Sequence, residues 1–125
     1  MCDRVEAAYR DGRVPINSAE GVIRQIIGWR EFVWGVFWLW PDQYDVNTLG
    51  HDRALPPTWT GEAQTSLRCL DIALESVTER AWIHHIQRLM VLSNFANLYG
   101  IDPARVRDWM RQQYVDGANW VMAPT

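Results

Sequence analysis

The 125-residue chain contains no lysine, only two cysteines and no long apolar run. Cys2 and Cys69 are too few for a disulfide framework or a complete zinc site. No segment approaches the ~20 apolar residues that a membrane span needs, and the N-terminus lacks the basic start and apolar stretch of a signal peptide. The basic residues are all arginine and the formal net charge is −3, so the chain shows no overall basic footprint for nucleic acid. These absences predict a soluble protein of the reducing cytoplasm.

Apolar residues make up 48% of the chain and charged residues 22%, a balance that allows a folded core and excludes a disordered chain. Eight tryptophans exceed what a core of this size requires, and each brings an N–H that needs an acceptor when it is buried. A glycine-rich phosphate loop, a Ser-His-Asp set and a nucleophile elbow are absent. The composition therefore predicts a tryptophan-rich globular domain and names no reaction.

Apolar residues recur at helical spacing wherever the chain has a period, and strand alternation is absent. The spacing predicts an all-α helical bundle. The first two expected helices are residues 3–11 and residues 19–40, the second with a cap at 17–18. A third helix is capped by Thr65 or Ser66 and continues through Val77. The last two are residues 81–99 and a helix from residue 103 to the break at Gly117. Residues 41–64 hold several prolines and glycines and are expected to form a long loop, of a length that is usually functional or disordered.

Two side-chain groups stand out as chemical candidates. His84 and His85 are adjacent, so on a helix their imidazoles point about 100° apart and cannot share one face or hold zinc alone; the alternative is one core histidine and one solvated histidine. Arg88 and Asp116 could pair across a helix interface. A buried pair would indicate a polar ligand nearby, whereas a surface pair would carry no function.

Other residues have a plain structural interpretation beside a functional one. Cys69 lies among apolar residues of an expected helix, where a lone cysteine is usually an inert small hydrophobe. The aromatic residues of 34–40 fit a core or a surface that faces a partner, and they could also stack on a planar ligand.

Four segments in order resemble the FAD-binding helical domain of the photolyase/cryptochrome superfamily: residues 17–32 (NSAEGVIRQIIGWREF), 55–62 (LPPTWTGE), 84–95 with HHIQRLM and Asn94-Phe95, and 100–121 with GIDP, Trp109, YVD and Trp120-Val121. The branch they resemble is that of the iron–sulfur bacterial cryptochromes and (6-4) photolyases. The match covers about residues 5–124. The resemblance implies that residues 1–125 are an internal fragment, a partial FAD-binding helical domain without the N-terminal α/β antenna domain and the C-terminal cluster-binding segment.

The resemblance also implies roles for single residues around the cofactor. Asp116 matches the carboxylate beside the isoalloxazine ring of FAD, and Arg88 matches its salt-bridge partner. Gln25, Trp29 and Arg30 match positions of the family helix that lines the flavin and lesion cavity.

Catalytic roles follow from the same resemblance. His85 matches the proton donor to the lesion, and imidazole gains and loses a proton near neutral pH. Trp109 and Trp59 match the electron-relay tryptophans. Cys69 matches the first of four cysteines that hold a [4Fe–4S] cluster, but the other three are absent here.

Some positions depart from the family pattern. Ala118 and Met122 replace an aromatic and an acidic residue near the flavin, and Trp34 stands where the family often has a basic residue. Two residues are inserted between Gly61 and Cys69, which makes the match of Trp59 less direct than that of Trp109.

The function that the resemblance implies is blue-light-driven repair of pyrimidine (6-4) lesions in DNA by electron transfer from reduced FAD. Damaged DNA is then the partner of the full-length protein, and the 125 residues alone are expected to be inactive, since half a cofactor pocket loses the contacts that affinity requires. There are two alternatives: a fragment of a sensory cryptochrome, and a non-catalytic helical module that binds a partner through residues 34–40. The sequence does not indicate an oligomeric state.

Overall fold

A computed structural model describes residues 1–124, and it confirms the all-α class. The α-helical and π-helical (η) segments are α1 (Cys2–Arg10), α2 (Ile16–Arg24), η1 (Gln25–Glu31), α3 (Phe32–Leu39), α4 (Arg68–Arg80), α5 (His85–Gln87), η2 (Arg88–Ser93), α6 (Asn94–Tyr99), α7 (Pro103–Gln113) and α8 (Asn119–Met122). Within the described residues, β pairing is limited to an isolated bridge between Arg53 and Ile101. No helix in this part of the chain has the length and apolarity to cross a membrane.

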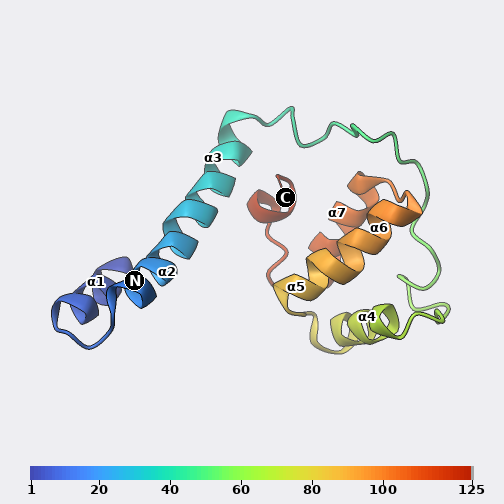
Figure 1. Ribbon diagram of the computed structural model, residues 1–125. Coiled ribbons are helices and arrows are strands. Elements are labelled where there is room, and N and C mark those ends of the chain that lie inside the picture. Colours follow the sequence, from blue (N-terminus) through green and yellow to red (C-terminus); the bar gives the residue numbers. More distant parts are fainter. Residues whose placement is uncertain (125) are drawn as a thin grey trace.

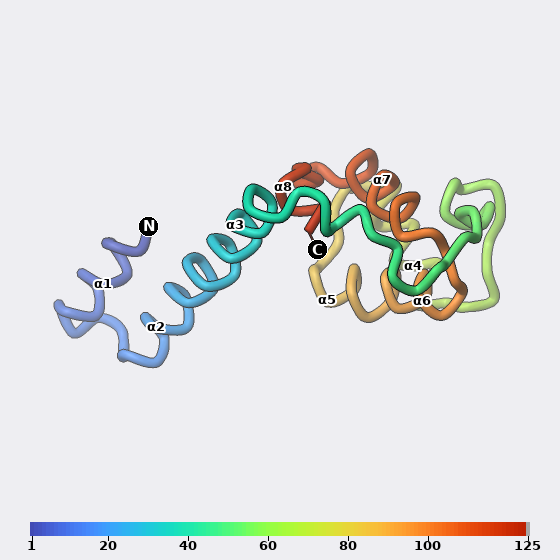
Figure 2. The backbone as a smooth tube through the Cα atoms, turned by 90° about the horizontal axis from the view of Figure 1, so that it is seen from above, coloured from blue at the N-terminus to red at the C-terminus, as the bar shows by residue number. Residues whose placement is uncertain are grey.

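The N-terminal part of the molecule is a long helical arm. The segments α2, η1 and α3 follow one another without a break, α1 folds back against α2, and the arm projects from the remaining helices (Figures 1 and 2). The arm meets the rest of the fold where α3 packs against α8. Many of its large apolar side chains are exposed: Ile16, Val22, Ile27, Trp29, Phe32, Trp34, Trp38 and Leu39. The arm therefore presents a surface that its own fold leaves uncovered.

The core lies in the other half of the molecule, where α4, η2, α6 and α7 pack together (Figure 1). The apolar stripes of these helices meet there because their spacing places one face of each helix inward. The buried residues of this core are Trp59, Leu70, Ala73, Leu74, Val77, Ile83, Leu92, Ala96, Ile101, Trp109 and Tyr114. One of them, Trp59, comes from the loop between α3 and α4, so the loop completes the core.

The long loop was expected at residues 41–64 and runs without a helix through 40–67. It is fastened to the turn between α6 and α7, because the Arg53 N–H donates to the Gly100 carbonyl at 3.1 Å and the Asp102 N–H donates to the Arg53 carbonyl at 3.0 Å. An ion pair between Asp45 and Arg107 of α7 adds a second attachment. These attachments hold the loop where Trp59 can enter the core.

The helix expected over 81–99 begins later than the sequence suggested. Ala81 has the left-handed conformation (φ 52°) and ends α4, so the chain turns before α5 starts at His85. His84 then caps α5: its Nδ1 accepts from the Ile86 N–H at 3.1 Å, and the Gln87 side chain accepts from the His84 N–H at 3.3 Å. This reciprocal arrangement is a capping box, with histidine in the place usually taken by serine or threonine.

Three other helix ends also differ from expectation. The cap expected at residues 17–18 is wrong because α2 starts at Ile16, directly after Pro15. Thr65 does not cap α4, which starts at Arg68; instead its N–H and hydroxyl donate to the Asp71 carboxylate at 2.9 and 2.7 Å. The last long helix, α7, ends at Gln113 rather than near Gly117.

Candidate functional site

Arg88 and Asp116, which are far apart in the sequence, meet in a two-point ion pair. The Arg88 Nη1 lies 2.9 Å from Asp116 Oδ1, and Nη2 lies 3.1 Å from Oδ2. The Arg88 Nε also donates to the Ile83 carbonyl at 3.1 Å. The arginine side chain is 10% exposed and the aspartate side chain 53% exposed. The sequence left open a buried pair or a surface pair. The structure shows neither, because the cation is buried and the carboxylate faces outward.

Tyr114 covers the guanidinium from another side. The Arg88 Cζ lies 4.0 Å from the centre of the Tyr114 ring, a close cation–π contact. The tyrosine is buried, and its hydroxyl has no hydrogen-bond partner within the described residues. Burial raises the pKa of Tyr114 to about 12, while the Arg88 charge pulls it down and the Asp116 charge pushes it up. The sequence placed Tyr114 in the last expected helix and missed this contact, because nothing in the spacing joins it to Arg88.

The turn after α7 sets the position of Asp116. The Val115 N–H donates to the Ala81 carbonyl at 2.9 Å, and the Gly117 N–H donates to the Tyr114 carbonyl at 3.0 Å. Gly117 also packs closely on α7, since a Cβ there would lie 2.9 Å from the Arg111 carbonyl oxygen. The aspartate is therefore held by backbone contacts to the ends of two helices, α4 and α7.

Trp109 and Trp59 form a buried aromatic pair beside this site. Their ring centres are 4.7 Å apart, and the Trp109 Nε1–H donates to the Trp59 carbonyl at 3.0 Å. Trp109 also meets the Tyr114 ring edge-on at 6.0 Å. Rings thus lie in contact from the ion pair through Tyr114 and Trp109 to Trp59. The structure brings the two candidate relay tryptophans together.

Both π-helical segments carry candidate residues. Arg88 is the first residue of η2, and Gln25, Trp29 and Arg30 all lie in η1. A π turn holds an additional residue, and such turns occur frequently at functional sites. The sequence predicted uninterrupted helices at both places, because apolar spacing does not distinguish an α turn from a single wider turn.

The three candidate residues of η1 are exposed on the arm. Arg30 is linked to the other half of the molecule, because its guanidinium lies 5.4 Å from the ring centre of Trp120 in α8. It also pairs with Glu31 at 2.6 Å. Trp29 is 43% exposed. Arg30 therefore reaches the C-terminal segment that follows Asp116. Within residues 1–124, no hydrogen bond, ion pair or ring contact joins Gln25 or Trp29 to Arg88 or Asp116.

The histidine expectation is corrected in part. Neither His84 nor His85 is a core residue: both are exposed. The Nδ1 of His84 accepts the hydrogen bond that caps α5. His85 is the first residue of that helix, three residues before Arg88. His85 is therefore placed on the surface next to the buried arginine.

Cys69 lies near the start of α4 and is exposed, not buried among apolar side chains. Within residues 1–124, no group of three or more histidine, cysteine or acidic side chains is arranged to hold a metal ion. The expected cluster role of Cys69 rests on the resemblance alone.

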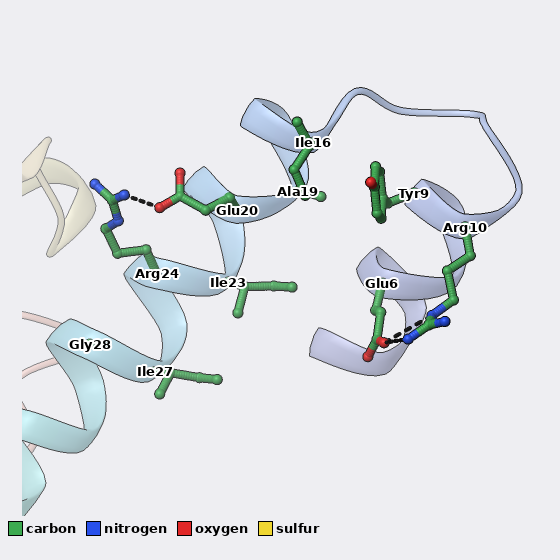
Figure 3. A pocket seen from close by; sticks show the side chains of 10 residues that line it. All are labelled: Glu6, Tyr9, Arg10, Ile16, Ala19, Glu20, Ile23, Arg24, Ile27 and Gly28. Atoms are coloured by element: carbon green, nitrogen blue, oxygen red, sulfur yellow. Dashed lines mark hydrogen bonds and ion pairs between the residues drawn. The ribbon is translucent and has the colours of Figure 1, made fainter.

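An open groove of about 700 Å³ lies elsewhere, between α1 and the α2–η1 segment (Figure 3). Ile16 and Ile23 of α2 and Ile27 of η1 extend into it, and Tyr9 of α1 faces them. Ion pairs between Glu6 and Arg10, and between Glu20 and Arg24, lie at its edges. It belongs to the exposed arm and contains no part of the Arg88–Asp116 site.

Comparison with known proteins shows similarity to a curated photolyase. A curated (6-4) photolyase of Agrobacterium fabrum is 46% identical over 126 aligned residues, and the match covers 99% of this chain. It covers 24% of that photolyase, so the chain spans about a quarter of the length of the curated relative it matches. No protein-family model matches the chain. By sequence, the chain is similar to one stretch of that photolyase.

Proposed function

We propose that this chain forms one wall of the flavin cavity of a light-driven DNA photolyase that repairs pyrimidine (6-4) lesions. The observation that carries the proposal is the ion pair of Arg88 and Asp116, with a buried cation and a half-exposed carboxylate. The similarity to a (6-4) photolyase supports the choice of reaction.

The residues present fit the edge of an isoalloxazine ring. A carboxylate fixed at both oxygens by one arginine keeps its outer lone pairs free to accept from an N–H donor. Because Arg88 is buried and bonded on its other side to the Ile83 carbonyl, Asp116 is held in one orientation. Bound FAD would supply one-electron chemistry driven by light, and the ion pair would help to set which of its charge states is stable.

The aromatic pair would supply the path for electrons that restore the reduced flavin. Trp109 and Trp59 are in contact and shielded from water, which suits the passage of an electron between indoles. We assign the first step of this path to Trp109, because Trp109 also contacts Tyr114 beside the ion pair.

Contacts to DNA are assigned to the exposed residues near the pair. His85 is exposed three residues before Arg88, so its imidazole is accessible to donate a proton to a bound lesion. Gln25, Trp29 and Arg30 would line the same cavity from η1. Cys69 would be one of the four ligands of an iron–sulfur cluster, and the reducing cytoplasm suits the two free thiols of the chain.

The 125 residues alone are proposed to be inactive, because they supply one edge of the cofactor site. The test replaces the matching stretch of the Agrobacterium photolyase with this chain and measures flavin content, photoreduction and light-dependent repair of (6-4) DNA. Asp116→Asn in the chimera is expected to lower flavin content or block photoreduction. Glu6→Gln, which removes an ion pair with Arg10 on α1 away from the site, is the control and leaves both unchanged.

Results against the proposal are equally concrete. Full flavin content and repair in the Asp116→Asn chimera would remove the ion pair from the mechanism. Co-purification of FAD with the isolated chain, together with light-dependent repair, would contradict its inactivity.

Two alternatives have their own outcomes in this test. A chimera that photoreduces flavin but repairs no lesion would favour a sensory cryptochrome. A folded chimera without flavin would favour a helical interaction module, a function that the exposure of Trp38 (63%) and Trp40 (52%) supports.

A further inference from the structure

Trp59 is an unsuitable end for an electron path, because it does not reach water. Its residue is 4% exposed, and its Nε1–H is buried without an acceptor among the described residues. An oxidised indole at this position can neither release its proton nor meet an external reductant. A path through Trp109 and Trp59 therefore needs a further oxidisable residue that reaches solvent.

The aromatic contacts continue outward from Trp59. Its ring lies 6.5 Å from the Phe95 ring at an interplanar angle of 28°, and Phe95 lies 5.5 Å from Tyr99 at 13°. Phe95 and Tyr99 are four residues apart on α6, so the helix itself stacks them. Tyr99 is 41% exposed and ends the row at the protein surface.

Tyr114 contacts the tryptophan pair directly, through Trp109, but its surroundings oppose oxidation. A phenol is oxidised readily only when its proton can leave at the same time. The Tyr114 hydroxyl is buried without a partner in the part of the chain that the structure describes, and the Arg88 cation lies over its ring. A positive charge on that ring would be repelled by the guanidinium, so Tyr114 stays reduced.

We infer that Tyr99 is the terminal electron donor of an aromatic row Trp109–Trp59–Phe95–Tyr99. The inference rests on the proposed function, in which a photoexcited flavin is the one-electron oxidant. One electron passes from Tyr99 to oxidised Trp59 across Phe95, which serves as a bridge and is not itself oxidised. The phenol proton goes to water, leaving a neutral tyrosyl radical, and a small thiol or ascorbate returns one electron while water returns the proton.

Arg53 supports proton loss at this terminus. Its guanidinium lies 4.9 Å from the ring centre of Tyr99. A cation over the ring disfavours a positively charged intermediate, so electron and proton leave together. The backbone of Arg53 is fixed to Gly100 and Asp102, which keeps this side chain beside the ring.

The test uses the whole 125-residue chain and needs no flavin. Cys2 and Cys69 are replaced by serine, and Val115→Cys is labelled with a ruthenium polypyridyl photo-oxidant. Val115 is 79% exposed and lies between Tyr114 and Asp116, so the label starts at the ion-pair end of the row. A flash with a soluble electron acceptor generates the oxidant, and transient absorption with electron paramagnetic resonance identifies tryptophan and tyrosine radicals.

The expected result is a tryptophan radical that converts to a tyrosyl radical. Tyr99→Phe keeps the ring stack but removes the tyrosyl signal and lengthens the life of the tryptophan radical. Phe95→Leu slows the conversion. Tyr9→Phe, in α1 at the far end of the arm (Figure 1), is the matched control and leaves the signal unchanged. Circular dichroism of each variant checks that it is folded.

Two results would overturn the inference. A tyrosyl radical that survives Tyr99→Phe rules out Tyr99. A radical lost with Tyr44→Phe instead would assign the path to a second row, in which Tyr44 stacks on Phe37 at 5.9 Å and leads to Trp34 and Trp120. Because no flavin is present, failure of FAD to bind leaves this result intact, and failure of the tyrosyl step leaves the role of Asp116 intact.

Discussion

Replacing Asp116 by asparagine tests whether the ion pair stabilises the fold. Exposed ion pairs contribute about 0–1 kcal/mol, and breaking a buried pair costs about 3–5 kcal/mol. The Arg88 side chain is 10% exposed and the Asp116 side chain 53% exposed, so this pair is buried at one end. We expect Asp116→Asn to lower the free energy of unfolding by about 2 kcal/mol, between these limits.

The size of this stability loss depends on which contacts Arg88 keeps in the Asp116→Asn variant. The substitution leaves the guanidinium its bond to the Ile83 carbonyl and its contact with the Tyr114 ring, but no counter-charge. Water can approach only from the side where Asp116 was exposed. The cost is therefore smaller than for a fully enclosed cation and larger than for a surface pair.

The assay is urea unfolding followed by circular dichroism, in a double-mutant cycle with Arg88→Met. Arginine to methionine keeps much of the apolar stem, so the cycle isolates the charge interaction, which we expect to be about 1.5 kcal/mol. Asp45→Asn is the matched control at a pair with a more exposed cation, expected below about 1 kcal/mol. A coupling energy below about 0.3 kcal/mol would refute the reasoning, because it would mean that the two charges do not interact in solution.

Other positions give simpler expectations. Ala81→Gly should stabilise the fold by about 1 kcal/mol, because alanine at φ 52° is strained; thermal unfolding measures it. Tyr114→Phe should stabilise by about 1 kcal/mol by removing a buried hydroxyl without a partner in the described chain. The pKa of Tyr114 is 10.0 in the unfolded chain and about 12 in the folded protein. The free energy of unfolding should therefore fall as the pH rises from 10 towards 12, and the Tyr114→Phe variant should lose this dependence. Gly117→Ala should destabilise by about 2 kcal/mol, because its Cβ would lie 2.9 Å from the Arg111 carbonyl oxygen. Gly35→Ala, where a Cβ meets nothing within 4 Å, should instead stabilise by about 0.5–1 kcal/mol.

The sequence predicted the helical class and the positions of most helices because apolar spacing is a local property. It failed at helix ends, where single contacts decide. Ala81 takes a left-handed conformation that is usual for glycine, and the capping role of His84 follows from a side-chain rotamer. Neither feature leaves a trace in hydrophobic periodicity.

The site was predicted only in outline. Spacing allowed a pair between Arg88 and Asp116, and the resemblance selected it. Burial at one end and exposure at the other could not be predicted, because both depend on how Tyr114 and the turn after α7 pack. The aromatic row through Phe95 was also missed, since it joins a loop residue to a helix that is distant in sequence.

The wide turns of η2 have a consequence for any shortened version of the chain. If one residue were deleted from Arg88–Ser93 while the wide turn persisted, every residue beyond it would shift by one helical position, a rotation of about 100° and a movement of about 1.5 Å along the axis. Phe95 would then leave the side of the helix that faces Trp59, while Arg88 kept its place. A length change of one amino acid could thus disconnect the outer rings from the carboxylate end and leave every individual side chain of the row intact.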